Sequence, residues 1–299
     1  MILQLLADGV LSGAIIALGA IGMALAMKIL GFANFSHSEL VTWGAYLALI
    51  LVLIGPGGAP IGPFSFGWTV VGGLVLAGIL TAALAVSVDA LVFRPLRRRG
   101  AVPVTIIFAS FGAALVLRNG LLLWWGPQAH YYTRELQMAV QVLPGVRIMP
   151  DQVFVLGLSL ALVAALHLFL TYTRFGIAMR AVAESPTLAR VSGIEVERVI
   201  RWTWVISGGL AAVGGVFFGL TVQIRPEMGF NLLLPIFAAA ILGGLGSLWG
   251  SVLGGLIIGL AESLSVLVAA PGYKPAAPFV FLMLILFLRP TGLFGEEQA

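Results

Sequence analysis

The stretch Lys28–Tyr46, KILGFANFSHSELVTWGAY, interrupts a strongly apolar chain with polar residues and then becomes apolar again. The polar residues of this break are Asn34, Ser36, His37, Ser38 and Glu39. Polar groups at membrane depth need internal partners, so an irregular break persists only inside protein or beside a water-filled cavity. Its meaning therefore depends on the segments that flank it.

The composition of the whole chain indicates that those segments lie in a membrane. Of 299 residues, 60% are apolar and only 9% are charged, with a mean hydropathy of +1.09. A soluble domain has roughly a quarter of its residues charged. The sequence therefore predicts an all-α, polytopic transmembrane helix bundle. The net charge of +4 requires no nucleic-acid partner, and the absence of cysteine excludes disulfides and cysteine–metal sites.

The apolar runs predict about eight or nine spans, some of them broken or re-entrant. A helix that crosses the hydrocarbon needs about 20 apolar residues, and three of the runs are short enough to be half-spans or broken helices. No linker separates the runs, so residues 1–299 are expected to form a single transmembrane domain. Asp8 and the lack of an N-terminal basic region favour a first span over a cleaved leader. The runs are 7–29, 39–54 (short), 68–93, 103–123, 152–173, 202–222, 232–247 (short), 249–268 and 277–290 (short).

The distribution of Lys and Arg predicts the orientation. Loops 94–102 and 174–201 together hold nine basic residues, whereas the alternate loops hold four. Cytoplasmic loops of membrane proteins are enriched in Lys and Arg, so these two loops are expected in the cytoplasm. Counting spans then places the N-terminus outside and the C-terminal tail, 295–299, in the cytoplasm.

The polar break allows two interpretations. A bend at Gly31 followed by polar side chains suits a broken helix beside a transport pathway, because freed helix ends present oriented dipoles there. The alternative is a short cytoplasmic turn in which Ser36 or Ser38 caps the following helix.

A second interruption, rich in glycine, lies at 243–250. Each glycine costs about 1 kcal/mol in a helix relative to alanine, so a continuous helix through this segment is not expected. Paired interruptions, one in each half of a chain, indicate a transport site, which favours a pathway role shared with 31–39. The alternative is a tight turn between two spans.

The loop 174–201 is expected to form a pair of short cytoplasmic helices. The first is interrupted at Ser185-Pro186, and the second has Ser185 as N-cap, Pro186 at its first position and a stop at Gly193. Such a pair suits docking of a soluble cytoplasmic partner. The alternative is a surface helix that rests on lipid headgroups, held by its arginines.

The titratable residues are scattered and predict no catalytic or metal site. The chain also lacks the pattern G-x-x-x-x-G-K followed by Ser or Thr. If ATP drives this protein, another chain must bind it. We therefore predict a non-enzymatic protein without cofactors.

Four ordered motifs resemble the permeases of branched-chain amino acid ABC transporters. They are the break itself, the 174–201 loop, the stretch AAAILGGLGSLWGSVLGGLIIGLAE and the ending RPTGLFG. The chain departs from the family pattern at Ser38, where the family usually has glycine. The matching residues of the first two motifs are Gly31, Asn34, Phe35, Ser36, His37, Glu39, Gly44, Ala45 and Tyr46, then Arg180, Ala181, Ala183, Ala189, Gly193 and Ile194.

The resemblance implies an importer subunit in the bacterial inner membrane, with ATP hydrolysis on separate cytoplasmic subunits. It also implies a second related permease and a soluble extracytoplasmic substrate-binding protein, besides the membrane lipid. The cargo of such permeases is a branched-chain or other amino acid, urea, a short amide or an aromatic acid. The candidates for the translocation pathway are Asn34, Phe35, His37, Glu39, Gly243, Gly244 and Gly246. The candidates for coupling to the ATPase are Arg180, Ala181, Glu184, Ala189 and Gly193.

Two other classes remain open on sequence grounds. An ion-coupled secondary transporter would need an ion site, for which only His37, Glu39 and Glu262 lie deep enough. A passive channel for a small neutral solute would work without partners. The long coupling-like loop counts against both.

Overall fold

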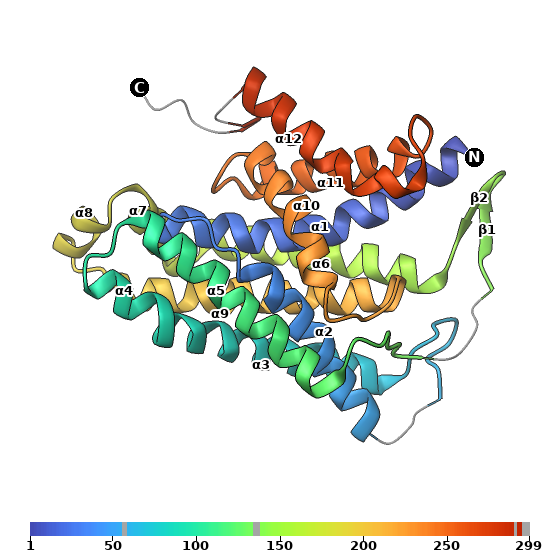
Figure 1. Ribbon diagram of the computed structural model, residues 1–299, viewed down its shortest axis with the longest axis horizontal. Coiled ribbons are helices and arrows are strands. Elements are labelled where there is room, and N and C mark those ends of the chain that lie inside the picture. Colours follow the sequence, from blue (N-terminus) through green and yellow to red (C-terminus); the bar gives the residue numbers. More distant parts are fainter. Residues whose placement is uncertain (56–58, 134–137, 290–291, 295–299) are drawn as a thin grey trace.

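The computed structural model describes residues 1–55, 59–133, 138–289 and 292–294, and within them the fold is a bundle of helices with one small hairpin (Figure 1). Seven of the described helices are long and apolar enough to cross a membrane, and two apolar helices are shorter. The prediction of an all-α polytopic bundle is therefore confirmed. The elements are α1 (Ile2–Leu30), α2 (His37–Ile54), α3 (Trp68–Val88), the π-helical turn η1 (Asp89–Phe93), α4 (Arg94–Arg98), α5 (Pro103–Trp125), β1 (Val140–Leu143), β2 (Val146–Ile148), α6 (Pro150–Tyr172), α7 (Arg174–Glu184), α8 (Pro186–Val191), α9 (Val196–Thr221), α10 (Met228–Gly243), α11 (Leu248–Ser265), the 3-10 turn η2 (Pro271–Ala276) and α12 (Ala277–Leu288).

Most helix boundaries differ by a few residues from the predicted runs, and α9 and α10 show the reasons. Helix α9 begins at Val196 instead of 202, because its first turns carry charged residues that a hydropathy pattern excludes although the helix continues through them. Helix α10 covers Met228–Gly243 instead of 232–247, because Gly244 adopts a left-handed φ of 92° and ends it. The antiparallel pair β1–β2, with Val140 opposite Ile148, lies in a loop for which no strand was predicted.

The two arginine-rich loops lie at the same end of the bundle. In Figure 1, α4 lies at the left end together with α7 and α8, whereas the N-terminus and the β1–β2 hairpin lie at the right end. An ion pair of 3.3 Å between Arg94 and Glu197 joins the two loops there. At the opposite end, Gln4 of α1 holds the hairpin through its hydrogen bonds to the backbone of Arg147.

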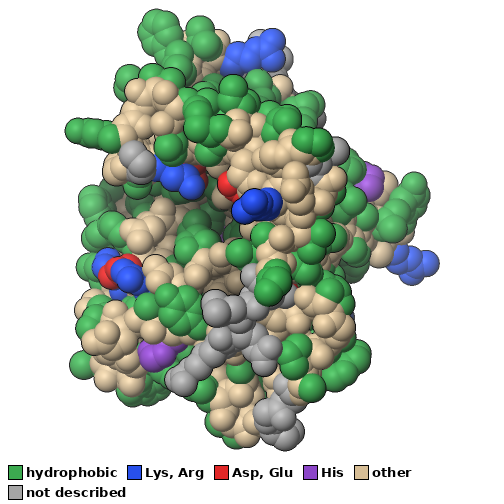
Figure 2. Space-filling view, turned by 90° about the vertical axis from the view of Figure 1, so that its right-hand side faces the viewer, with side chains coloured by type: hydrophobic (Ala, Val, Ile, Leu, Met, Phe, Trp, Pro, Cys, Tyr) green, Lys and Arg blue, Asp and Glu red, His purple; other side chains and the backbone are tan. Residues whose placement is uncertain are grey.

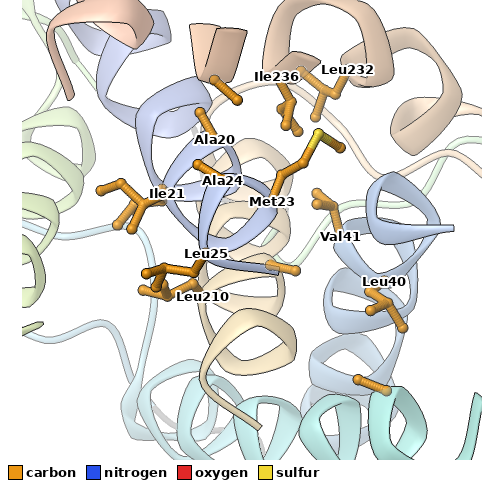
Figure 3. Packing of buried hydrophobic residues seen from close by; sticks show 14 of the residues in the cluster. Ala20, Ile21, Met23, Ala24, Leu25, Leu40, Val41, Leu210, Leu232 and Ile236 are labelled. Carbon is orange, nitrogen blue, oxygen red and sulfur yellow. The ribbon is translucent and has the colours of Figure 1, made fainter. Parts of the chain in front are cut away.

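Helix α1 is the centre of the core, because α9, α10 and α11 all pack on it. Figure 3 shows its residues Ala20 to Leu25 in contact with side chains of the neighbouring helices. Helix α11 approaches α1 closely at glycines. A side chain at Gly13 would meet the backbone of Leu256 on α11. Lipid provides no hydrophobic drive between helices, so this close backbone packing is what stabilises their contact.

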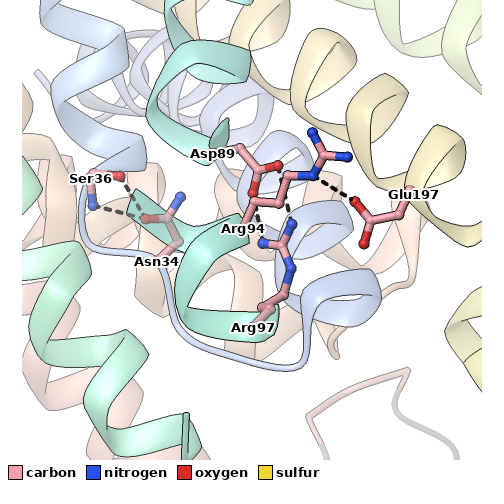
Figure 4. Close-up of polar contacts among 6 residues, drawn as sticks. All are labelled: Asn34, Ser36, Asp89, Arg94, Arg97 and Glu197. Carbon is pink, nitrogen blue, oxygen red and sulfur yellow. Dashed lines mark hydrogen bonds and ion pairs between the residues drawn. The ribbon is translucent and has the colours of Figure 1, made fainter. Parts of the chain in front are cut away.

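A buried ion pair fixes the arginine-rich end. Asp89, in η1, is almost fully buried and accepts hydrogen bonds of 2.6 and 3.1 Å from the guanidinium of Arg97, as Figure 4 shows. Because each carboxylate oxygen has its own N–H donor, the pair has the bidentate geometry that favours a buried charge. The π-helical turn of η1 places Asp89 where this bond can form.

Tyr132 provides a test of how the loop between α5 and β1 is held. Burial raises the pKa of its hydroxyl well above the usual range, so the group stays protonated, and it donates a 2.8 Å hydrogen bond to the carbonyl oxygen of Ala45 in α2. Tyr132→Phe removes this bond and should lower the free energy of unfolding by about 1 kcal/mol. Thermal unfolding in detergent measures the change. The exposed neighbour Tyr131 is the control, and an equal loss for Tyr131→Phe would contradict the assignment.

Candidate functional site

The polar break is a re-entrant segment that returns to the middle of the bundle. Helix α1 ends at Leu30, and Gly31, with φ of 75°, caps it. Helix α2 then begins at His37, whose Nε2 lies 3.0 Å from the carbonyl oxygen of Gly19, halfway along α1. Gly19 and Leu30 are about 16 Å apart along a helix axis, so residues 31–36 carry the chain back along α1 before a turn at Phe35 and Ser36 leads into α2. The break is therefore no minimal turn at the cytoplasmic surface.

The backbone of the break is satisfied by side chains instead of by a helix cap. The Asn34 side-chain oxygen accepts hydrogen bonds from the backbone N–H and the hydroxyl of Ser36, at 3.1 and 2.7 Å (Figure 4). The N–H of Phe35 donates to the Ser110 hydroxyl of α5, and the Ser38 hydroxyl donates to the carbonyl of Phe35. Ser36 is the N-cap residue of α2, but its side chain makes no cap hydrogen bond to the helix, so the alternative of a turn with a serine side-chain cap is not supported.

His37 joins three helices at this level. Its ring is fully buried and lies 3.2 Å from the Ser207 hydroxyl of α9 in addition to its contact with Gly19. A side chain at Gly22 of α1 would meet the ring. The imidazole thus fixes the start of α2 against both α1 and α9.

A second re-entrant segment meets the first; the short run 232–247 was predicted to be a half-span or broken helix, but its contact with α2 was not predicted. Helix α10 begins at Met228, and the N–H of Gly229 donates a 2.9 Å hydrogen bond to the Thr42 hydroxyl of α2. A side chain at Gly229 would overlap the carbonyl of Ser38. Two helix N-termini, each with a partial positive charge, therefore meet inside the bundle. The charged residues in 222–227 look like those of an outer loop, and the interruption before a short apolar run was the only signal.

Arg118 of α5 and Glu39 of α2 interact electrostatically near this meeting point. The guanidinium of Arg118 lies 5.0 Å from the ring centroid of Phe230, and its charge acts on Glu39. The Arg118 Nε and one Glu39 carboxylate oxygen are buried and have no hydrogen-bond partner among the described residues. The amide nitrogen of Asn34 shares this property. Buried polar atoms without partners are rare, so each of these atoms is available to a polar solute or a partner chain.

The glycine-rich turn lies at the arginine-rich end, apart from the meeting point of α2 and α10. Gly243 lies against the backbone of Gly250, Gly244 and Gly246 adopt left-handed φ values of 92° and 90°, and Gly246 packs on the Lys28 side chain. The turn therefore borders the C-terminal end of α1. A cavity of about 180 Å³ lies between the turn and α7, with Arg180 among its lining residues.

Helices α7 and α8 form the predicted pair, with the predicted caps. The Ser185 hydroxyl accepts from the N–H of Leu188, Pro186 is the first helical residue, and Gly193 has a φ of 83°. Among the other coupling candidates, Arg180 and Glu184 are exposed, Ala181 is half-buried and Ala189 is buried. The Arg180 guanidinium donates a 2.9 Å hydrogen bond to the carbonyl of Leu170, which braces the corner between α6 and α7.

The surface of this pair includes exposed apolar side chains. Leu188 and Val191 of α8 are 69% and 84% exposed. Beside them, a groove of about 830 Å³ separates α7 from the start of α9, with Phe175 and Trp202 in its walls and Arg174 and Arg198 at its edges. Exposed apolar groups of this kind mark an interaction surface.

His37→Ala tests the role of the break. The substitution removes both contacts of the ring and leaves a cavity between α1, α2 and α9, so we expect transport to fall about tenfold or more while partner subunits remain bound. Uptake and subunit retention should be measured in the same preparation. Full uptake by the variant would reduce the break to a connecting turn.

The sequence comparisons agree with a multi-pass membrane permease, the class that this bundle with its re-entrant segments defines. Residues 5–288 match the family described as branched-chain amino acid transport system permease component. The chain therefore belongs to this family. It is the membrane-spanning permease of an ABC importer, a class in which ATP hydrolysis takes place on separate subunits.

Relatives align over nearly the whole chain. The high-affinity branched-chain amino acid permease protein BraD of Pseudomonas aeruginosa is 32% identical over 99% of this chain and 96% of its own. The corresponding protein LivH of Escherichia coli has the same identity and coverage. A probable branched-chain amino acid permease protein LivH of Methanocaldococcus jannaschii is 31% identical over 96% of this chain and 92% of its own.

Proposed function

We propose that this chain imports a branched-chain amino acid or a related small polar solute, as one permease of a pair driven by cytoplasmic ATP-binding subunits. The observation that carries this proposal is the α7–α8 pair, with its exposed Leu188 and Val191 and the adjoining groove. A protein that only conducts a solute has no need for such a surface. In this proposal Arg180, Ala181, Glu184, Ala189 and Gly193 form or shape the docking site of the ATPase.

The proposed translocation pathway runs along the face formed by α2, α5 and α10, between this chain and the second permease. Phe35 lies there between Phe111 and Phe237, at centroid distances of 6.2 and 5.2 Å. Glu39 contributes a carboxylate with an unpartnered oxygen. Asn34 and His37 hold the break in shape, and the turn of Gly243, Gly244 and Gly246 forms the inner end.

The transport step in this proposal is alternating access. Closure of the ATP-binding subunits pushes α7, and the Arg180–Leu170 hydrogen bond passes that movement to α6. Residues of α7, Lys28 of α1 and Gly246 of the glycine turn line one cavity. A movement of α7 therefore also changes its position relative to α1 and to this turn. The two re-entrant helix ends then change their relative position, which opens one side of the pathway as the other closes.

The orientation completes the proposal. We place residues 1–299 as one permease domain in the bacterial inner membrane, with α7 and α8 in the cytoplasm and the N-terminus outside, where a soluble binding protein delivers cargo. Both arginine-rich loops lie at one end, as the enrichment of basic residues on the cytoplasmic side requires. The tail 295–299, expected in the cytoplasm, lies outside the described residues, as does Arg134 of the expected outer loop.

Reconstitution tests this function. Proteoliposomes that contain the purified complex, together with the binding protein, should accumulate radiolabelled L-leucine or another of the small polar solutes named above. They should do so only when ATP is present inside the vesicles, on the side of the ATP-binding subunits. Uptake that follows an ion gradient, or flux through vesicles that hold this chain alone, would contradict the proposal and indicate an ion-coupled transporter or a passive channel.

Arg118→Gln tests the pathway face. The variant keeps N–H donors but loses the charge that acts on Glu39 and the cation–π contact with Phe230. We expect uptake to fall about tenfold or more, with unchanged ATPase retention. Asn119→Ala, one residue along α5 on its exposed side, is the matched control. Normal uptake by Arg118→Gln would remove α5 from the pathway.

A further inference from the structure

The end of the bundle that carries the N-terminus contains a cavity that lies apart from the face of α2, α5 and α10. Its volume is about 260 Å³, and it lies between α1, α9, α10 and α11 beside the η2 turn. Three ionisable side chains line it: Asp8, Glu262 and Lys274. Apolar side chains complete the wall, among them Leu11, Ile15 and Leu232.

The charged groups of this cavity are free to bind a ligand. The ion pairs formed by the described residues include none of the three, although Lys274 acts electrostatically on Glu262. One oxygen of Asp8 accepts a 3.0 Å hydrogen bond from Gln4, whose side chain also holds the hairpin. A carboxyl group such as that of Glu262, within a membrane helix, is costly to maintain and usually marks a functional site.

The arrangement along α1 separates charge from apolar surface. Asp8 lies nearer the outer end of the helix, whereas Leu11 and Ile15 lie one and two turns deeper on the same side. Figure 2, which views this end of the molecule, shows basic and acidic side chains gathered beside a hollow in a largely hydrophobic face. A ligand would therefore meet charges of both signs at the rim and apolar surface below.

We infer that this cavity binds a small zwitterion with an aliphatic side chain. The Lys274 ammonium receives the ligand carboxylate, Glu262 and Asp8 receive its ammonium, and the aliphatic group packs against Leu11 and Leu232. Sites for drug-sized ligands begin at about 300 Å³, so a slightly smaller cavity suits a free amino acid. The choice of an amino acid as ligand rests on the proposed function. The site would be the first point on this chain that cargo meets after release at the outer face.

Equilibrium binding of radiolabelled L-leucine to the full-length chain in lipid nanodiscs tests the inference. Leucinamide, which lacks the carboxylate, and 4-methylpentanoate, which lacks the ammonium, serve as competitors of the same carbon skeleton. We expect saturable binding, with each competitor weaker than unlabelled leucine by about tenfold or more. This series uses the unaltered chain, so it is decisive even if a variant does not fold.

Two variants locate the site. Glu262→Gln and Lys274→Gln should each weaken binding by about tenfold or more, whereas Arg147→Gln, on the exposed hairpin at the same end, should leave it unchanged. Absence of saturable binding, binding that neither variant weakens, or equal competition by leucinamide would overturn the inference. ATP-driven uptake by the complex without such binding would reject the cavity and leave the proposed function intact. Binding by a chain that assembles with no ATPase would support the cavity and reject the proposed function.

Discussion

Arg180→Glu should release the ATP-binding subunits from the complex while the permease still inserts and folds. Arg180 is exposed on α7, and its guanidinium braces the α6–α7 corner by the hydrogen bond to Leu170. The substitution reverses the charge of the proposed docking surface and removes the donor that connects this surface to α6. We expect the retained ATPase to fall about tenfold or more, because disrupting a charged contact at an interface costs a few kcal/mol.

The measurement is quantitative co-purification through a tag on the permease, with size-exclusion chromatography to verify its fold. Arg180→Gln preserves N–H donors without the charge and should retain an intermediate amount of ATPase. Arg147→Glu, the same charge reversal on the hairpin at the opposite end, should have no effect. If Arg180→Glu retains as much ATPase as the unaltered chain, α7 is not the docking surface.

Gly215→Ala should strongly lower the free energy of unfolding although it adds a single methyl group. A side chain at Gly215 of α9 would overlap the carbonyl oxygen of Val41 in α2. A backbone atom cannot turn aside, so the two helices would have to separate at the level of the break. We expect a loss of about 3 kcal/mol, the upper part of the range for overpacked cores, which is a large fraction of a typical domain's stability.

Gly209→Ala on the same helix is the matched control. A side chain there meets no atom within 4 Å, and alanine favours a helix over glycine by about 1 kcal/mol. Both variants gain this helix propensity, so the difference between their unfolding temperatures in detergent isolates the overlap at Gly215. Equal unfolding temperatures would show that the α2–α9 contact is looser than described here.

The general architecture was predictable because membrane helices are marked by length and hydropathy. The apolar runs, the α7–α8 pair and its caps at Ser185 and Gly193 follow from rules that act locally along the chain. A broken helix at the polar break was one of two open interpretations, supported by the need of Asn34 and Glu39 for partners at membrane depth. Each of these features depends on residues that are close in sequence.

The parts that could not be predicted depend on contacts between distant segments. Nothing in the local pattern indicates that Gly229 meets Thr42, because the charged residues just before it are typical of a solvent-exposed loop. The group formed by Glu39 and Arg118 is similarly hidden, since the two residues lie on different helices. The hairpin β1–β2 was missed because short strands in a loop of a helical protein give a weak signal.

Co-purification from the native membrane tests the central claim most directly. A tag on this chain, gentle detergent and mass spectrometry of the bound proteins would identify its partners. We predict recovery of ATP-binding subunits and a second, related permease, with ATPase recovery reduced by Arg180→Glu. Recovery of this chain without any ATP-binding subunit, in a preparation that still transports, would contradict the claim that ATP-binding subunits drive it.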